Sequence, residues 1–153
     1  MNSFQISVQF LIDPRDGYAT EGGYANDPND PGGETNYGIS KRSYPDLDIK
    51  NLSLSNAISI YKRDYWDANS LDTVPLPLCI VMLDGYVNHG PRVMKPLIAA
   101  AKGNWKALIQ ERIKFYLRLI QRNPQMSIYK KGWLNRMNQL NKFCTIAEIY
   151  NET

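Results

Sequence analysis

The arrangement of apolar and polar residues along the chain predicts an irregular beginning followed by a series of helices. Apolar and polar residues alternate over residues 4–12, FQISVQFLI, and this period of two favours a β-strand. A short buried helix fits the same residues. Asp13 and Pro14 have the residue types of a helix N-cap and first position, so a short helix is expected to begin there. Glu21, which precedes Gly22, would lie in its last turn.

Residues 26–38, NDPNDPGGETNYG, contain Pro and Gly too densely for a regular helix, and a loop or hairpin is expected there. Helical spacing then begins at about Ser53, with Ser53 or Ser55 as the capping residue. Further helices are expected over residues 76–88, 91–102, 105–121 and 126–150. Gly132 is expected to break the last of these.

The clearest helical pattern covers residues 105–121, where apolar residues recur on one face. That face is expected to comprise Trp105, Leu108, Ile109, Ile113, Tyr116, Leu117 and Ile120. The basic residues of the segment, including Arg112, are expected largely elsewhere. A chain of 153 residues suits one domain. The predicted organisation is a single domain over residues 1–153, with a small irregular lobe over about 1–50 and a helical lobe over about 51–150.

Charge is unevenly distributed between these lobes. Residues 1–85 carry 6 Lys or Arg and 12 Asp or Glu side chains, whereas residues 86–142 carry 12 basic side chains and one acidic one, Glu111. A basic lobe indicates a polyanionic partner such as nucleic acid, a membrane surface or a bacterial envelope. The simpler interpretation is a solvated helical surface without a specific partner. Because no recognised nucleic-acid motif is present, we do not expect a nucleic-acid partner.

The cysteines and the histidine bear on metal chemistry. Cys79 and Cys144 are too few for a disulfide framework, and both are expected to be free thiols. A hydrolytic zinc site normally takes three protein ligands, which the single histidine, His89, argues against. His89 is expected to be a surface or capping residue rather than a catalytic base. In DPNDPGGE, Pro31 occupies a position that the EF-hand pattern requires for a calcium ligand. We therefore expect no metal and no cofactor.

Two carboxylates are candidates for the pair of acidic groups that glycoside hydrolysis uses. That reaction usually takes a protonated carboxyl group, whose pKa is raised by burial, and a second, ionised one. Glu21 precedes a Gly-Gly pair, and Asp30 follows nine residues later in a loop stiffened by Pro and Gly. Thr35 could hold a water molecule through its hydroxyl. On spacing alone, the simpler interpretation is that Glu21 is a solvated helix end and Asp30 a turn residue.

Residues 21–49, EGGYANDPNDPGGETNYGISKRSYPDLDI, resemble the signature of glycoside hydrolase family 108, which comprises phage endolysins and related bacterial muramidases. The similarity continues beyond this segment. Ala57, Tyr61 and Tyr65-Trp66 resemble the family's next helix, and residues 84–90, DGYVNHG, are similar to its central D-x-x-V-N-x-G element. Residues 132–136, GWLNR, are similar to its C-terminal element. The resemblance therefore covers most of the chain.

The resemblance implies a lysozyme-like, mainly α fold with a small β part. It also implies hydrolysis of the β-1,4 bond between N-acetylmuramic acid and N-acetylglucosamine in peptidoglycan. The family's essential acid corresponds to Glu21. Asp30 would position water or stabilise the transition state, and a third role falls to either Thr35 or Asn36. The alternative function is a non-catalytic protein that binds cell wall or polyanions on the same scaffold.

Four residues are candidates for substrate binding. Tyr24 and Tyr37 flank the loop, and their rings suit the faces of sugars, although packing beneath the loop explains them equally well. Asn36 and Asn88 carry amides able to bind acetamido or hydroxyl groups. The alternative for Asn88 is a helix C-cap before Gly90.

The expected partner is bacterial peptidoglycan, and the expected oligomeric state is a monomer. The family's wall-binding motif is replaced here by KPLIAAAKGNW, so non-specific attraction of the basic lobe to the anionic envelope is the hypothesis instead. No integral membrane segment and no secretory signal are expected. The protein is therefore expected to be made in the cytoplasm of a host bacterium and to act on the cell wall in the periplasm, after release through a pore made by another protein.

Overall fold

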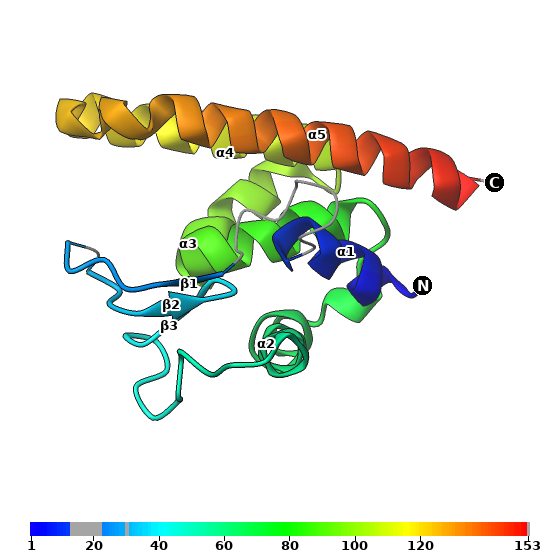
Figure 1. The fold of residues 1–153 in the computed structure, drawn as a ribbon. Helices are drawn as coiled ribbons and strands as arrows, with labels where there is room; N and C mark the ends of the chain where they lie inside the picture. Colours follow the sequence, from blue (N-terminus) through cyan, green and yellow to red (C-terminus); the bar gives the residue numbers. More distant parts are fainter. Residues whose placement is uncertain (13–22, 30, 153) are drawn as a thin grey trace. The chain divides into compact units, whose positions relative to one another are not determined.

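The computed structural model describes residues 1–12, 23–29 and 31–152 of the chain (Figure 1). The helix start expected at Asp13 and Pro14 lies outside the described residues, as do Glu21 and Asp30. The chain divides into two compact units, Met1–Ser70 and Leu71–Thr153. The division follows residue 70 rather than residue 50, and the single domain stays a prediction.

The first unit begins with a helix, α1 (Ser3–Ile12), so the favoured strand prediction for these residues was wrong and the alternative of a short buried helix is confirmed. Asn2 and Gln5 form a reciprocal cap, in which each side-chain oxygen accepts a hydrogen bond from the other's backbone N–H, at 2.8 and 2.9 Å. Residues around most of the helix circumference are buried, which explains why the pattern lacked a helical period. The buried residues are Phe4, Ser7, Val8, Phe10, Leu11 and Ile12.

The segment 26–38, where a loop or hairpin is expected, belongs to a small antiparallel sheet. It leads from the first strand to the second and contains the second strand. The strands of the sheet are β1 (Tyr24–Ala25), β2 (Thr35–Asn36) and β3 (Ile39–Ser40), in the order β1-β2-β3. The two residues between β2 and β3, Tyr37 and Gly38, have φ angles of 51° and 78°. Positive φ at both positions is the requirement of the tightest hairpin turns, and glycine meets it without strain. The loop or hairpin prediction is confirmed.

Helix α2 (Leu54–Tyr61) follows the sheet and continues into η1 (Lys62–Trp66) and η2 (Asp67–Asn69). Of the two serines proposed as its cap, Ser53 has this role, because its hydroxyl accepts a hydrogen bond from the N–H of Asn56 at 3.1 Å. Trp66 is fully buried and meets the ring of Phe4 edge-on, with 5.4 Å between ring centroids. This contact joins η1 to α1 within the first unit.

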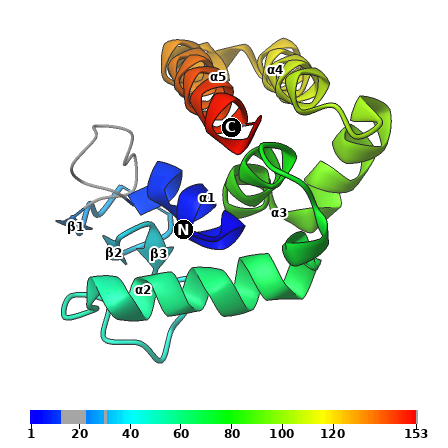
Figure 2. The same ribbon diagram turned by 90° about the vertical axis from the view of Figure 1, so that its right-hand side faces the viewer.

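The second unit contains η3 (Leu71–Thr73), α3 (Leu78–Ala101), α4 (Trp105–Arg122), η4 (Pro124–Tyr129) and α5 (Lys130–Glu152). Helix α4 packs against both α3 and α5 (Figure 2). Gly90 has φ 79° and ψ 166°, so α3 consists of two helices joined at a kink, as predicted from Pro91. Gly132, by contrast, does not break α5, and that prediction was wrong. The glycine is exposed and helical, a position where the residue is tolerated.

None of the helices in the described part of the chain combines the length and the apolar character that a membrane span requires.

The cap of α2 gives a first prediction. Replacement of Ser53 by Ala removes the acceptor for the N–H of Asn56 and should lower the free energy of unfolding by about 1 kcal/mol. The matched control is Ser55→Ala, since Ser55 lies inside the helix and is exposed. That change should leave stability within about 0.5 kcal/mol. Urea unfolding of both variants is the measurement, and equal midpoints would exclude Ser53 as the cap.

Candidate functional site

Strand β2 places Thr35 and Asn36 in different surroundings. Neighbouring residues of a strand point to opposite faces of the sheet. The Asn36 side chain is buried, and its Nδ2 donates to the carbonyl of Ile49 at 3.0 Å and to that of Lys50 at 3.3 Å. The amide therefore holds the sheet to the backbone that leads into α2. Thr35 lies on the other face, opposite Ala25 and Ser40, and is half-buried.

Tyr24 is exposed and has a fixed hydroxyl group. It pairs with Asn36 in the sheet register, and its OH donates to Oε2 of Glu34 at 2.8 Å. This hydrogen bond raises the pKa of the Tyr24 phenol. Glu34 was not among the predicted site residues. The signal that could have found it is the register, because Glu34 precedes Asn36 by two residues and so shares a face with Tyr24.

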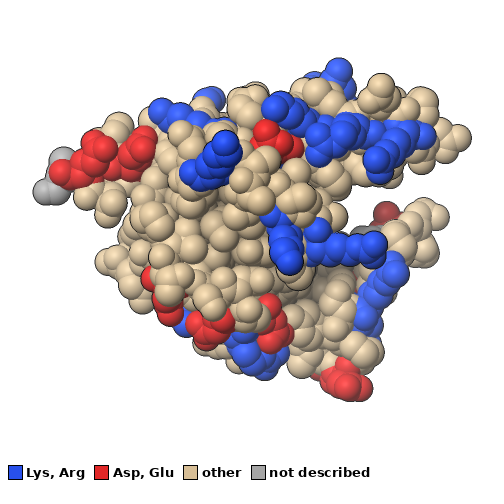
Figure 3. Space-filling view, turned by 180° about the vertical axis from the view of Figure 1, so that it is seen from behind, with Lys and Arg blue, Asp and Glu red and all other residues tan. Residues whose placement is uncertain are grey.

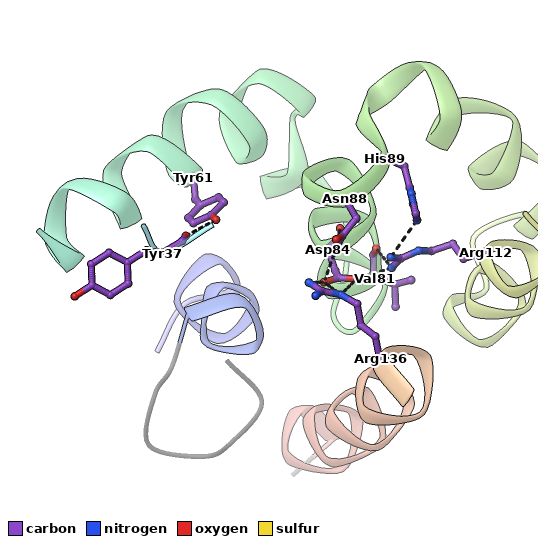
Figure 4. A network of polar contacts seen from close by, with 8 residues as sticks. All are labelled: Tyr37, Tyr61, Val81, Asp84, Asn88, His89, Arg112 and Arg136. Carbon is purple, nitrogen blue, oxygen red and sulfur yellow. Dashed lines mark hydrogen bonds and ion pairs between the residues drawn. The ribbon is translucent and has the colours of Figure 1, made fainter. Parts of the chain in front are cut away.

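Tyr37 occupies the turn between β2 and β3. Its carbonyl accepts a hydrogen bond from the Tyr61 hydroxyl at 2.7 Å, which ties the turn to α2 (Figure 4). Tyr61 is fully buried. The Tyr37 ring points away from this contact and is half-buried. The backbone carbonyl of Tyr37 thus anchors the turn to Tyr61, and the Tyr37 ring takes no part in this contact.

The two predicted carboxylates, Glu21 and Asp30, lie outside the described residues, and their roles stay predictions. The described part of the candidate site is the sheet that follows Glu21 in sequence. Within it, the sheet register separates Thr35 from the face that carries Tyr24 and Asn36. The fourth predicted binding residue, Asn88, belongs to α3 of the second unit.

The second unit contains a buried charge cluster formed by Asp84, Arg112 and Arg136, one residue from each of α3, α4 and α5 (Figure 4). The side chains of Asp84 and Arg112 are 1% and 0% exposed. Arg112 Nη1 lies 2.8 Å from Asp84 Oδ2, and Arg136 Nη2 lies 2.6 Å from Asp84 Oδ1. Two sequence elements singled out above, DGYVNHG and GWLNR, therefore meet in one ion-pair network.

Electrostatics in the cluster favours the ionised carboxylate. Burial by itself raises the pKa of Asp84, but the charges of Arg112 and Arg136 outweigh this effect and hold the pKa below its usual range. Arg112 Nη1 also lies 3.4 Å from the carbonyl of Val81. Arg112 Nε is buried without a hydrogen-bond partner among the described residues. The cluster therefore carries one more positive charge than negative.

The position of Arg112 corrects a prediction. It was expected away from the apolar face of α4, yet it lies seven residues after Trp105 and four before Tyr116, both buried residues of that face. Leu117, expected on the apolar face, is exposed. The signal that was missed is Asp84 in an apolar run, since a buried carboxylate requires a cationic partner.

His89 is half-buried and packs against aromatic rings rather than projecting freely into solvent. Its ring meets Phe115 and Tyr116 edge-on at centroid distances of 5.0 and 5.2 Å, and Nε2 lies 3.5 Å from Arg112 Nη2. Burial, followed by the charge of Arg112, lowers the pKa of His89 to about 4. The imidazole is therefore neutral at physiological pH.

Asn88 uses its amide within its own helix. Its Nδ2 donates to the backbone carbonyl of Asp84 at 2.7 Å, shortly before the helix breaks at Gly90. This contact runs back to a carbonyl inside the helix, four residues earlier, while the Asn88 residue itself is exposed. The Asn88 amide is thus engaged in the fold of the second unit.

A stack of aromatic rings leads from the charge cluster to the start of α5. The rings of Tyr116 and Trp133 stack at 4.7 Å with 18° between their planes. Trp133 in turn stacks on Tyr129 at 5.7 Å. The GWLNR element therefore contributes both a stacked indole, Trp133, and an ion-paired guanidinium, Arg136.

Cys79 and Cys144 are free thiols, as predicted, and both are buried. Burial raises the pKa of the Cys144 thiol, so the group is an unreactive thiol rather than a thiolate. Within the ranges that the structure describes, no three His, Cys, Asp or Glu side chains are grouped so that they could hold a metal ion.

Comparison with known proteins agrees with the fold and the motifs. Residues 17–90, about half of the chain, match the family model described as glycosyl hydrolase 108. No curated protein matches the sequence. The structure of Brucella abortus SagA has a similar fold, with a TM-score of 0.73 and 23% sequence identity over 95% of each chain. The mainly α, lysozyme-like fold is confirmed.

The family match indicates that this protein is a glycoside hydrolase. The family resemblance of the sequence is confirmed over residues 17–90, which match the glycosyl hydrolase 108 family model. The GWLNR element lies beyond the matched residues.

The lowered pKa of His89 gives a second prediction. Below its ordinary pKa of 6.5 the unfolded chain binds a proton here, which the folded chain does not bind until about pH 4. The free energy of unfolding should therefore fall by about 2 kcal/mol as pH decreases through this window. Urea unfolding of wild type and His89→Gln across these pH values is the measurement. Because His89 is the sole histidine, the variant should lack this decrease, and parallel curves would contradict the assignment.

Proposed function

We propose that this protein hydrolyses the β-1,4 bond between N-acetylmuramic acid and N-acetylglucosamine in bacterial peptidoglycan. The observation that carries this proposal is the family match over residues 17–90, which include Glu21 and the whole sheet that follows it. The lysozyme-like fold is consistent with the proposal.

The proposed chemistry divides between two carboxyl groups. Glu21 donates a proton to the leaving glycosidic oxygen, which requires a carboxyl group that is still protonated near neutral pH. Asp30 stays ionised and either orients the attacking water or stabilises positive charge on the sugar ring in the transition state. Both residues belong to the segment whose sequence carries the family signature.

For the third role we favour Thr35 over Asn36. The donor group of the Asn36 side chain is directed to the carbonyls of Ile49 and Lys50, and the residue is buried. Thr35 lies on the opposite face of the same strand and is half-buried, so its hydroxyl group is better placed to hold a water molecule.

Among the residues predicted to bind the glycan, Tyr24 has the surroundings that best fit this role. Its ring is exposed, and the hydrogen bond to Glu34 fixes its orientation. Asn36 and Asn88 use their amides within the protein. We therefore assign Tyr24 to contact with a sugar face, with Glu34 as the residue that positions it and Tyr37 as a secondary contact.

The third prediction tests the acid. Glu21→Gln keeps the shape of the side chain but cannot donate a proton from a carboxyl group. It should reduce hydrolysis of purified peptidoglycan at least about 100-fold without changing thermal stability. Mass spectrometry of the products should show new reducing-end muramic acid with the wild type.

The matched control is Glu111→Gln, because Glu111 pairs with Lys114 on α4 and has no part in the proposed site. It should retain wild-type activity. Lysis of permeabilised cells by Glu21→Gln at the wild-type rate would contradict the acid assignment. Wild-type protein that binds peptidoglycan without releasing sugars would support the non-catalytic wall-binding alternative.

The fourth prediction separates Thr35 from Asn36. Thr35→Ala should lower kcat about 100-fold at unchanged stability, whereas Thr35→Ser should keep most of the activity because it retains the hydroxyl group. Asn36→Ala should instead lower the free energy of unfolding by about 1–3 kcal/mol, since the carbonyls of Ile49 and Lys50 lose their donor. Kinetics and urea unfolding on the same preparations are the measurements. A stable but inactive Asn36→Ala would assign the water to Asn36.

A further inference from the structure

The end of α4, the turn η4 and the start of α5 form a basic, partly apolar surface, residues 117–131, which we call the α4–α5 tip. Its exposed basic residues are Arg118, Arg122, Lys130 and Lys131. The sequence contains no Asp or Glu between Glu111 and Glu148, so no acidic side chain of the tip offsets these charges. Lys and Arg side chains gather along the arm of the second unit that carries α4 and the start of α5 (Figure 3).

The tip also exposes large apolar side chains. Ile128 is 76% exposed and Tyr129 is 53% exposed, and Leu117 is exposed at the end of α4. The Tyr129 ring is held by stacking on Trp133, which itself stacks on Tyr116. The fold therefore presents Tyr129 at the surface on a rigid support, next to Ile128 and between basic residues.

Several exposed basic side chains lie beside exposed large apolar side chains at only one end of α5. At its other end Ile146, Ile149 and Tyr150 are exposed, but there the acidic Glu148 and Glu152 are accompanied by a single exposed basic residue, Lys142, one turn before Ile146. The exposed Lys95 of α3 and Lys102, which follows α3 as its C-cap, have no large exposed apolar residue beside them among the described residues. The α4–α5 tip is thus distinct from the rest of the basic surface.

We propose that the α4–α5 tip docks on the surface of an anionic phospholipid membrane. Ile128 and the Tyr129 ring enter the interface between headgroups and acyl chains, where aromatic rings with a polar edge are favoured. The four basic side chains contact the lipid phosphates. A dissolved polyanion such as nucleic acid would use the charges but has no apolar layer for Ile128, so the combination favours a membrane. This docking is independent of the proposed hydrolytic activity.

The experiment is co-sedimentation of the full chain with phosphatidylcholine vesicles, prepared with and without phosphatidylglycerol. The wild type should bind only the vesicles that contain phosphatidylglycerol. The double variant Arg122→Gln with Lys131→Gln should lower the partition coefficient about 25-fold, or about fivefold for each basic side chain. Ile128→Asn should lower it about tenfold without changing the charge.

Matched controls lie elsewhere on the second unit. Lys95→Gln with Lys102→Gln removes the same charge from α3 and its C-cap. Ile149→Asn removes an apolar residue that is 57% exposed from the far end of α5. Each control should change the partition coefficient no more than about twofold, since screened charges act only over a short distance. Circular dichroism of every variant checks that the fold is retained.

Three outcomes would overturn the proposal. The first is absence of binding to phosphatidylglycerol vesicles. The second is an equal decrease of the partition coefficient in both double variants, Arg122→Gln with Lys131→Gln and Lys95→Gln with Lys102→Gln, together with no effect of Ile128→Asn. That result would mean unspecific attraction by net charge. The third is tighter binding to duplex DNA than to these vesicles, dependent on Arg122 and Lys131 and independent of Ile128, which would assign the tip to nucleic acid.

Discussion

The ion pairs of Asp84 with Arg112 and Arg136 are the interaction on which the second unit depends. The three residues come from α3, α4 and α5, and each is charged in a place from which water is largely excluded. Removing such groups from water costs several kcal/mol per ion, and only their mutual contact offsets this cost. The three helices therefore have one relative arrangement in which the buried charges are satisfied. The DGYVNHG and GWLNR elements are, in this structure, largely the two sides of that contact.

Local signals in the sequence were sufficient where a helix or turn is determined by its own residues. The cap at Ser53, the kink at Gly90 and the apolar stripe of α4 each follow from residues close together in the chain. For α1 a strand was favoured over the helical alternative, because burial around most of the helix circumference removes the helical period. Gly132 was misjudged because an exposed helical glycine costs only about 1 kcal/mol, which the packing of α5 overcomes.

In the candidate site, too, the sequence predicts what depends on neighbouring residues and not what depends on tertiary contacts. The segment that follows Glu21 was recognisable, because its glycines, prolines and carboxylates lie within a short stretch. The separate roles of Thr35 and Asn36 depend instead on strand register, and on backbone carbonyls that lie 13 and 14 residues further along the chain. The pairing of Asp84 with Arg136 spans 52 residues. Such contacts are consequences of the tertiary fold, and no local pattern encodes them.

The ring stack of Tyr116, Trp133 and Tyr129 reduces the conformational entropy of the exposed Tyr129 side chain. A tyrosine at an ordinary surface loses rotational freedom when a partner immobilises it, at a cost of about 0.5–1.5 kcal/mol for such a side chain. Tyr129 has lost much of that freedom on folding, because its ring already rests on Trp133. A partner that binds this ring therefore binds a preorganised side chain. The conformational entropy of Tyr129 is lost when the protein folds, so little of it remains to be lost on binding.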